Sequence, residues 1–165
     1  MRLFVGLLAV SLLSGCAHAA VPTARPASAL VAKSMSSFQD LDGRAVSLDQ
    51  FSGQPVVLVF LGTHTPDVDA EIPNLLRLSA AYAPHHVAFV AAGEDASAEA
   101  LQAFAQANQL TFPLWQDPAG LELAKRHMTQ LPAHQFIDRS GKVLASKQGF
   151  MSRGELLEQL ERLIK

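Results

Sequence analysis

The sequence predicts an α/β fold in which a central mixed sheet is flanked by helices. Apolar runs of strand length alternate with segments that have helical spacing, which implies a mainly parallel sheet. The last two predicted strands are joined by a short turn, which implies an antiparallel edge. The chain has 165 residues, about one domain, and a formal net charge of -2, which argues against a nucleic-acid-binding protein.

Residues 1–15 have the features of a bacterial secretion signal. Arg2 precedes an apolar run, residues 3–13, that is too short to span a bilayer. The run leads into Leu-Ser-Gly-Cys at residues 13–16, which resembles the bacterial lipobox. That resemblance implies cleavage before Cys16 and acylation of its sulfur, which would make a stable lipid anchor. The alternative is an ordinary signal peptide in which Cys16 lies near the cleavage site by chance.

Residues 16–36 are expected to form the lipid anchor and a flexible tether. The stretch after Cys16 is rich in Ala, Ser and Pro and has no sustained helical or strand period. Ala17 follows the cysteine, and by the resemblance to bacterial lipoproteins this residue implies the outer membrane rather than the inner one. We therefore expect the folded domain, residues 37–165, on the periplasmic side of a bacterial envelope, held to the membrane by lipid.

The folded domain is expected to begin with a short β-hairpin. Residues 38–47 form two alternating runs around Asp42 and Gly43, which is a type I′ turn signal. A helical turn at residues 48–51 follows. Residues 56–61 then form a continuous apolar and β-branched run, the pattern of a strand buried on both faces of a sheet.

Thr65 is expected to open the first long helix. It is a residue type that favours the N-cap, and Pro66 fits the first helical position, whereas Pro73 should kink the helix. The predicted elements that follow are a strand at 87–92, a helix at 97–108, an extended piece at 112–115, a helix at 121–126, strands at 135–138 and 143–149, and a final helix opened by a capping box at 152–155.

Residues 60–73, FLGTHTPDVDAEIP, resemble the F-W-A-T-W-C-P-P-C-R-A-E-M-P signature of the TlpA/ResA group of membrane-anchored thioredoxin-like oxidoreductases. This group belongs to the wider redoxin and thiol-peroxidase-like superfamily. Residues 112–117 and 131–138 are similar to two further motifs of the family. The resemblance implies a thioredoxin-like fold over about residues 38–165. It also implies that Pro132 is a cis-proline facing the active-site turn.

Thr65 and Val68 occupy the two cysteine positions of that signature. A threonine hydroxyl cannot form a disulfide, and valine has no thiol chemistry. Cys16 is the one cysteine of the chain and is expected to carry lipid. We therefore expect no catalytic residues and interpret the chain as a pseudoenzyme, a non-catalytic binding module. The alternative is the thiol-disulfide oxidoreductase or antioxidant activity that the family implies.

The expected binding site is a groove between the loop after residues 56–61 and the cis-proline. We expect it to hold an extended segment of an envelope protein, because backbone groups beside the cis-proline can pair with an added strand. The residues assigned to this groove are Thr63, His64, Thr65, Pro66, Asp67, Leu131 and Pro132.

A second resemblance concerns metal binding. Residues 63–69, THTPDVD, are similar to the T-H-C-P-D-V-C stretch of the Sco copper chaperones, but both cysteine positions differ and the copper ligands are not carried over. His64 and His134 could still meet at one rim and, with Asp67 or Asp69, bind copper or zinc. Our main expectation is a site without a cofactor, and the histidine-based metal site is the alternative.

Overall fold

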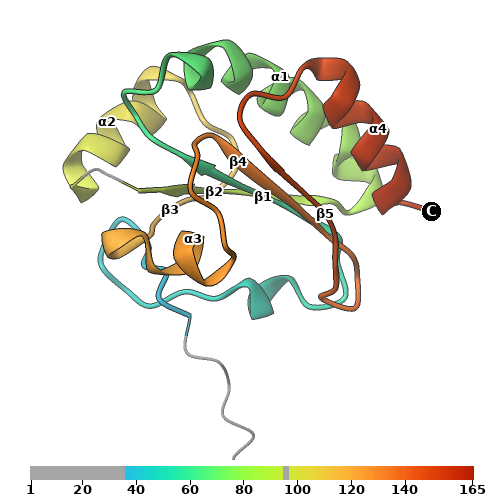
Figure 1. The fold of residues 1–165 in the computed structure, drawn as a ribbon, viewed down its shortest axis with the longest axis horizontal. Coiled ribbons are helices and arrows are strands. Elements are labelled where there is room, and N and C mark those ends of the chain that lie inside the picture. The colour runs from blue at the N-terminus through green and yellow to red at the C-terminus, as the bar shows by residue number, and fades with distance from the viewer. Residues whose placement is uncertain (1–35, 95–96) are drawn as a thin grey trace, which may run out of the picture. The chain divides into compact units, whose positions relative to one another are not determined.

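A five-stranded mixed sheet forms the centre of the fold, as the sequence predicts (Figure 1). The computed structural model describes residues 36–94 and 97–165. The predicted signal peptide, Cys16 and all of the predicted tether except Ser36 therefore lie outside the described residues.

The strands follow the predicted order along the chain. They are β1 (Val56–Leu61), β2 (Ala88–Gly93), β3 (Leu114–Gln116), β4 (Ala133–Ile137) and β5 (Val143–Gln148). Across the sheet the order is β3-β2-β1-β4-β5, in which β1, β2 and β3 are parallel and β4 and β5 form the antiparallel edge. All of β1 is buried, as expected for a central strand with a continuous apolar run.

Helices cover both faces of the sheet. They are α1 (Pro66–Tyr82), α2 (Ala98–Ala107), α3 (Leu121–Lys125) and α4 (Arg153–Leu163), with 3-10 turns η1 (Leu48–Phe51), η2 (Ala83–His85) and η3 (Pro118–Gly120). Figure 1 shows α1, α2 and α4 on one face of the sheet and α3 with η1 on the other. Ser152 and Glu155 form the predicted capping box of α4, and α1 continues through Pro73.

Each face of the sheet has its own apolar core, because successive strand residues point to opposite faces. The core below α1, α2 and α4 includes Ile72 and Phe136. The core on the other face is built around Phe38, Phe60 and Trp115. The ring centroid of Phe38 lies 6.0 Å from that of Phe60 and 5.3 Å from that of Trp115, so the N-terminal segment closes this second core.

The N-terminal hairpin is present but its turn was predicted wrongly. Its one bridge joins Gln39 to Ala45. Gly43 has a φ of 80°, whereas Asp42 is outside the left-handed region, and a type I′ turn needs a positive φ at both positions. The Gly43 N–H instead donates to the Asp40 carbonyl at 3.0 Å. The tight turn therefore lies one residue earlier, and Gly43 takes the left-handed position that follows it.

Glu122 ties α3 to the first described residues of the domain. Its side chain is 6% exposed. The carboxylate accepts hydrogen bonds from the Ser37 N–H at 2.9 Å and from Lys125 Nζ at 2.8 Å, and Arg126 binds the second oxygen. Burial raises the pKa of Glu122, but the donation from Lys125, Arg126 and Ser37 outweighs it and lowers the pKa to about 2.

Replacing Glu122 by Gln is expected to lower the free energy of unfolding at neutral pH by on the order of 3 kcal/mol, since the folded state stabilises the ionised carboxyl. The folded-state pKa of about 2 lies below the reference value of 4.5. The contribution is therefore complete above that reference value and is lost as the pH falls toward the folded-state pKa. Urea unfolding at neutral and acidic pH measures the effect.

The matched control for Glu122→Gln is Glu158→Gln. Glu158 forms an exposed ion pair with Arg162 on α4 at 2.8 Å, and such pairs contribute about 0 to 1 kcal/mol. A Glu122→Gln variant that is as stable as the Glu158→Gln variant at neutral pH would contradict the role assigned to Glu122.

Candidate functional site

The loop after β1 turns directly into α1. The Thr65 N–H donates to the Gly62 carbonyl at 3.1 Å, and the Val68 N–H donates to the Thr65 carbonyl at 3.0 Å. Thr65 occupies the predicted N-cap position with an extended backbone, and Pro66 is the first helical residue. The Thr65 side chain makes no capping hydrogen bond, so its hydroxyl does not play the predicted capping role.

The peptide bond between Leu131 and Pro132 is cis, which confirms the prediction. The last ladder pair between β1 and β4 joins Phe60 to Ala133. This register places Pro132 beside the residues that leave β1, so the two predicted walls of the groove are neighbours. Among the described residues, the backbone N–H and carbonyl of Leu131 have no hydrogen-bond partner.

Gln148 holds the loop that leads into Leu131. Its side-chain oxygen accepts from the backbone N–H of Thr129 at 2.7 Å and from that of Gln130 at 2.9 Å. The next residue, Gly149, donates its N–H to the Pro132 carbonyl at 2.7 Å. Sequence reasoning missed Gln148, because nothing in the sequence pairs a strand-end glutamine with a loop 18 residues earlier.

The two cysteine positions of the family signature lie in different surroundings. Val68 is 2% exposed and belongs to the core below α1, whereas Thr65 is half-buried at the start of the helix. An aliphatic side chain suits the Val68 position because it packs against other core residues. The arrangement supplies no ionisable sulfur at either place.

Glu71 and His134 form a buried pair behind the loop. Their side chains are 1% and 0% exposed, and His134 Nε2 lies 2.8 Å from Glu71 Oε1. This contact has the distance but not the geometry of a hydrogen bond, and Glu71 Oε2 and His134 Nδ1 also lack partners. Glu71 Oε1 accepts from the Met151 N–H at 3.3 Å. The pair thus connects α1, β4 and the turn between β5 and α4.

The expectation that His64 and His134 share one rim is wrong. His134 alternates with Gln135 along β4 and faces the core below α1, where its ring is fully buried against Glu71. His64 is exposed in the loop before α1. Residues 36–94 and 97–165 contain no group of three or more His, Cys, Asp or Glu side chains placed to hold a metal ion.

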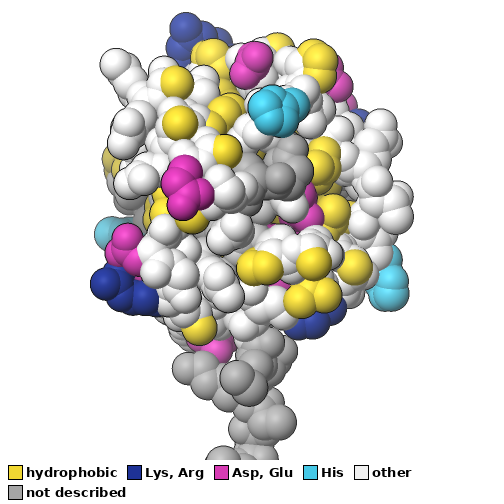
Figure 2. Space-filling view, turned by 90° about the vertical axis from the view of Figure 1, so that its left-hand side faces the viewer, with side chains coloured by type: hydrophobic (Ala, Val, Ile, Leu, Met, Phe, Trp, Pro, Cys, Tyr) yellow, Lys and Arg dark blue, Asp and Glu magenta, His cyan; other side chains and the backbone are white. Residues whose placement is uncertain are grey.

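The remaining charges beside the loop are acidic. Asp67 and Asp69 are exposed in the first turn of α1, where they complement the helix dipole, and neither has an ion-pair partner among the described residues. Figure 2 views the side of the molecule where β1 ends and α1 begins. Hydrophobic side chains form small separate groups on that face, so it presents polar and apolar contacts in alternation.

A cavity of about 510 Å³ lies away from this loop, between η1, α3 and the turn joining β4 to β5. Arg126 and Gln135 are among its lining residues, and their side chains hydrogen bond to each other at 3.1 Å. None of the residues predicted to form the groove lines it. The predicted groove residues and this cavity are therefore separate places on the molecule.

Comparison with known proteins agrees with this fold. The model of the AhpC/TSA family matches residues 26–146. The thiol-disulfide oxidoreductase ResA of Bacillus thuringiensis subsp. konkukian is 29% identical over 124 residues, which cover 75% of this chain and 72% of that protein. ResA of Halalkalibacterium halodurans is 27% identical, over 77% of this chain and 72% of that protein.

Solved structures show the same architecture. DsbF of MTB, described in mixed oxidised and reduced forms, superposes with a TM-score of 0.68 at 29% identity, over 76% of this chain and 92% of that one. The pneumococcal exposed lipoprotein thioredoxin Etrx1 of Streptococcus pneumoniae gives a TM-score of 0.63 at 22% identity, over 76% and 97%. None of the helices within residues 36–94 and 97–165 is long and apolar enough to cross a membrane.

Proposed function

Because the chain belongs to the AhpC/TSA family and its one cysteine, Cys16, precedes the matched residues 26–146, we propose that it is a non-catalytic binding module of that family. The position of that cysteine carries the proposal. Exchange through a mixed disulfide needs a thiolate in the active-site loop, and that loop offers Thr65 and Val68. The binding proposed here needs no metal or organic cofactor.

The proposed ligand is an extended segment of another envelope protein. Such a segment can pair with an exposed backbone edge as an added strand. The free N–H and carbonyl of Leu131 are suited to that pairing, and Gln148 and Gly149 fix the loop that carries them. A loop already held in one conformation loses less entropy on binding, which favours affinity. Without a thiol, the complex would be reversible.

We place this module on the periplasmic side of a bacterial envelope, anchored through lipid on Cys16 and directed to the outer membrane. The lipobox-like residues 13–16 and Ala17 support the anchor and its destination. Relatives support the compartment: one similar structure is that of a secreted disulfide oxidoreductase, and another is that of an exposed lipoprotein thioredoxin.

The names of the relatives favour a second function, a thiol-disulfide oxidoreductase that borrows thiols from a partner. In that case the bound segment would contain a reactive cysteine, and binding would depend on its redox state. The two functions therefore differ in whether a thiol-blocking reagent abolishes the complex.

Site-specific photo-crosslinking in intact cells tests the proposal. We expect a photoreactive amino acid at His64, which is exposed in the loop, to give defined adducts with envelope proteins. The matched control is the same amino acid at Arg162, which is exposed on α4. The adducts at His64 should survive prior treatment of cells with N-ethylmaleimide. The absence of adducts specific to His64 would overturn the binding module, and their loss after thiol blocking would favour the oxidoreductase.

A further inference from the structure

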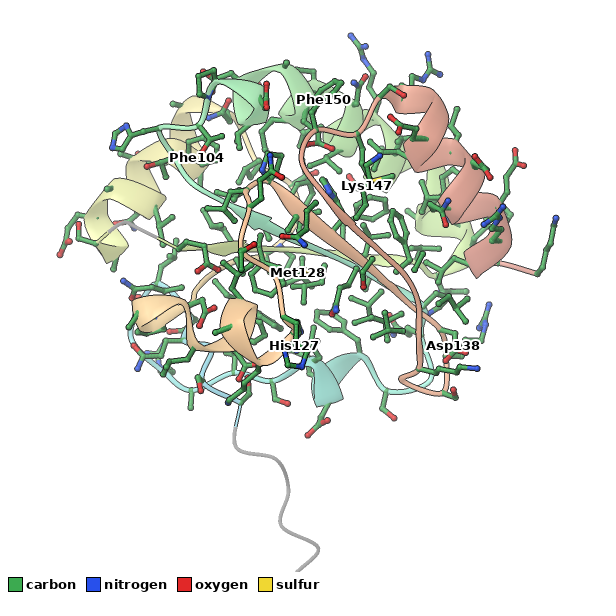
Figure 3. All side chains as sticks on the ribbon, in the orientation of Figure 1. Phe104, His127, Met128, Asp138, Lys147 and Phe150 are labelled. Atoms are coloured by element: carbon green, nitrogen blue, oxygen red, sulfur yellow. The ribbon has the colours of Figure 1, made fainter. Side chains whose placement is uncertain are left out.

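The cavity of about 510 Å³ between η1, α3 and the turn joining β4 to β5 has no part in the proposed function. Its volume is in the range of sites that bind small molecules. Asp138, labelled in Figure 3, belongs to the turn that forms one wall. Six charged side chains contribute to the lining: Asp49, Glu122, Lys125, Arg126, Asp138 and Arg139.

Arg126 is held in one position at this cavity. Its Nε donates to Gln135 Oε1 at 3.1 Å, and its Nη1 donates to the Glu122 backbone carbonyl at 3.1 Å and to the Glu122 carboxylate. The guanidinium carbon lies 5.4 Å from the ring centroid of Phe38 and 5.8 Å from that of Phe60. These contacts fix the plane of the guanidinium group before any ligand binds.

The second terminal nitrogen of Arg126, Nη2, has no hydrogen-bond partner among the described residues. It does not belong to the unpartnered atoms that are fully buried, so solvent reaches it. The Arg126 side chain is 20% exposed, and its charge is therefore screened less by water than that of a surface arginine. Nη2 thus offers preorganised N–H donors to an anionic oxygen.

The charges around Arg126 leave a positive excess. Arg126 and Lys125 share one carboxylate, that of Glu122, so this cluster carries two cations and one anion. The donation from both cations and from Ser37 lowers the pKa of Glu122 to about 2, which keeps the carboxylate ionised. On the turn between β4 and β5, Arg139 is exposed and has no ion-pair partner among the described residues.

The other two acidic groups of the lining do not neutralise this excess. Asp138 Oδ1 accepts from the Ser140 hydroxyl at 2.6 Å and from the Ser140 N–H at 2.8 Å, so it is bonded within its own turn. Asp49 is exposed, and water screens its charge. Neither carboxylate forms an ion pair with Arg126. A ligand that compensates the excess charge is therefore an anion.

The register of the sheet places an apolar wall next to Arg126. Gln135, which accepts from Arg126 Nε, and Ile137 are alternate residues of β4, so their side chains lie about 7 Å apart on one face of the sheet. Val143 is the cross-strand partner of Ile137, and both line the cavity together with Phe51 of η1. Val143 is 42% exposed, so an apolar group that enters the cavity removes apolar surface from water.

We propose that this cavity binds a small organic anion, a carboxylate with a compact apolar body. The carboxylate accepts from Arg126 Nη2, and the apolar body packs against Ile137 and Val143. An inorganic anion would leave these apolar side chains uncovered, and an uncharged ligand would not compensate the excess positive charge. This inference is independent of the proposed function, because none of the predicted groove residues lines the cavity.

Probes of similar shape and different charge test the inference. Benzoate, benzamide and acetate are titrated into the full chain in nonionic detergent, and the protein resonances are followed by nuclear magnetic resonance. We expect benzoate to bind about tenfold more tightly than the other two, with the largest shifts at residues 137–143 and at the Arg126 Nε–H. Equal affinity for benzoate and benzamide would overturn the inference, as would the absence of saturable shifts at these residues.

Val143→Asp and its matched control Leu144→Asp locate the site. The two residues are adjacent on β5 and are 42% and 46% exposed, but only Val143 lines the cavity. Both substitutions add the same charge to the chain. We expect Val143→Asp to weaken benzoate binding about tenfold and Leu144→Asp to leave it unchanged. Equal affinities of the two variants would contradict the assignment, and circular dichroism spectra like that of the wild type exclude misfolding as the cause of lost binding.

Discussion

The full chain is expected to show no turnover in an insulin-reduction assay, whereas a Thr65→Cys/Val68→Cys double variant is expected to exceed the background rate by about tenfold or more. The chain has the fold of disulfide oxidoreductases such as DsbF but offers no thiol at these two positions. The double substitution supplies a pair of thiols at the positions where the related signature has its cysteines.

The surroundings of the two positions favour a reactive pair. Thr65 is the N-cap residue of α1, where the helix dipole and free N–H groups stabilise a thiolate. Val68 lies three residues later on the same side of the helix, and cysteine at this site would be smaller than the valine it replaces, so the core need not expand.

The matched controls use the Cys16→Ser background, so that every measured thiol is an introduced one. Thr65→Cys alone should form mixed disulfides with the substrate but not turn over, because no second thiol resolves them. The reference rate is that of the Cys16→Ser variant that carries no introduced cysteine. Turnover by the wild type above this rate would contradict the non-catalytic interpretation. A double variant that folds and oxidises yet never turns over would show that the surrounding loop has also lost the geometry for exchange.

Much of the fold could be predicted because its signals are local. The continuous apolar run of β1 and the capping box of α4 each specify an element from a few adjacent residues. The turn near Gly43 was misjudged because an Asp-Gly pair suits more than one turn type, and the backbone angle at Asp42 decides between them.

The candidate site was less predictable because it depends on contacts between distant segments. Gln148 holds residues 129 and 130 through side-chain geometry that no spacing rule describes. His134 is different, because a signal was available. It shares a strand face with Phe136, and alternation in β4 already places both side chains in the core. The metal-site hypothesis treated His134 as a loop residue and so missed its burial.

Breaking the Glu71–His134 pair is expected to destabilise the domain strongly. Both side chains are buried, at 1% and 0% exposure, and Glu71 Oε1 lies 2.8 Å from His134 Nε2. Replacing either residue by Leu leaves the other polar side chain buried without the electrostatic contact that it makes at 2.8 Å, which costs on the order of 3 kcal/mol. The Glu71→Leu/His134→Leu double variant removes both polar groups at once. Its free energy of unfolding should therefore fall by about 2 kcal/mol less than the sum of the single losses.

Urea unfolding of the four proteins in this double-mutant cycle measures the coupling. The matched cycle uses Asp67→Leu and His64→Leu, two exposed residues of the loop, whose effects should add to within about 0.5 kcal/mol. Glu71 also accepts a hydrogen bond from the Met151 N–H. Glu71→Leu should therefore free the turn between β5 and α4, and amide exchange at residue 151 should become faster. Additive losses in the Glu71 and His134 cycle would mean that the two groups do not stabilise each other. The 2.8 Å contact would then be a result of packing and would not hold α1, β4 and the turn between β5 and α4 together.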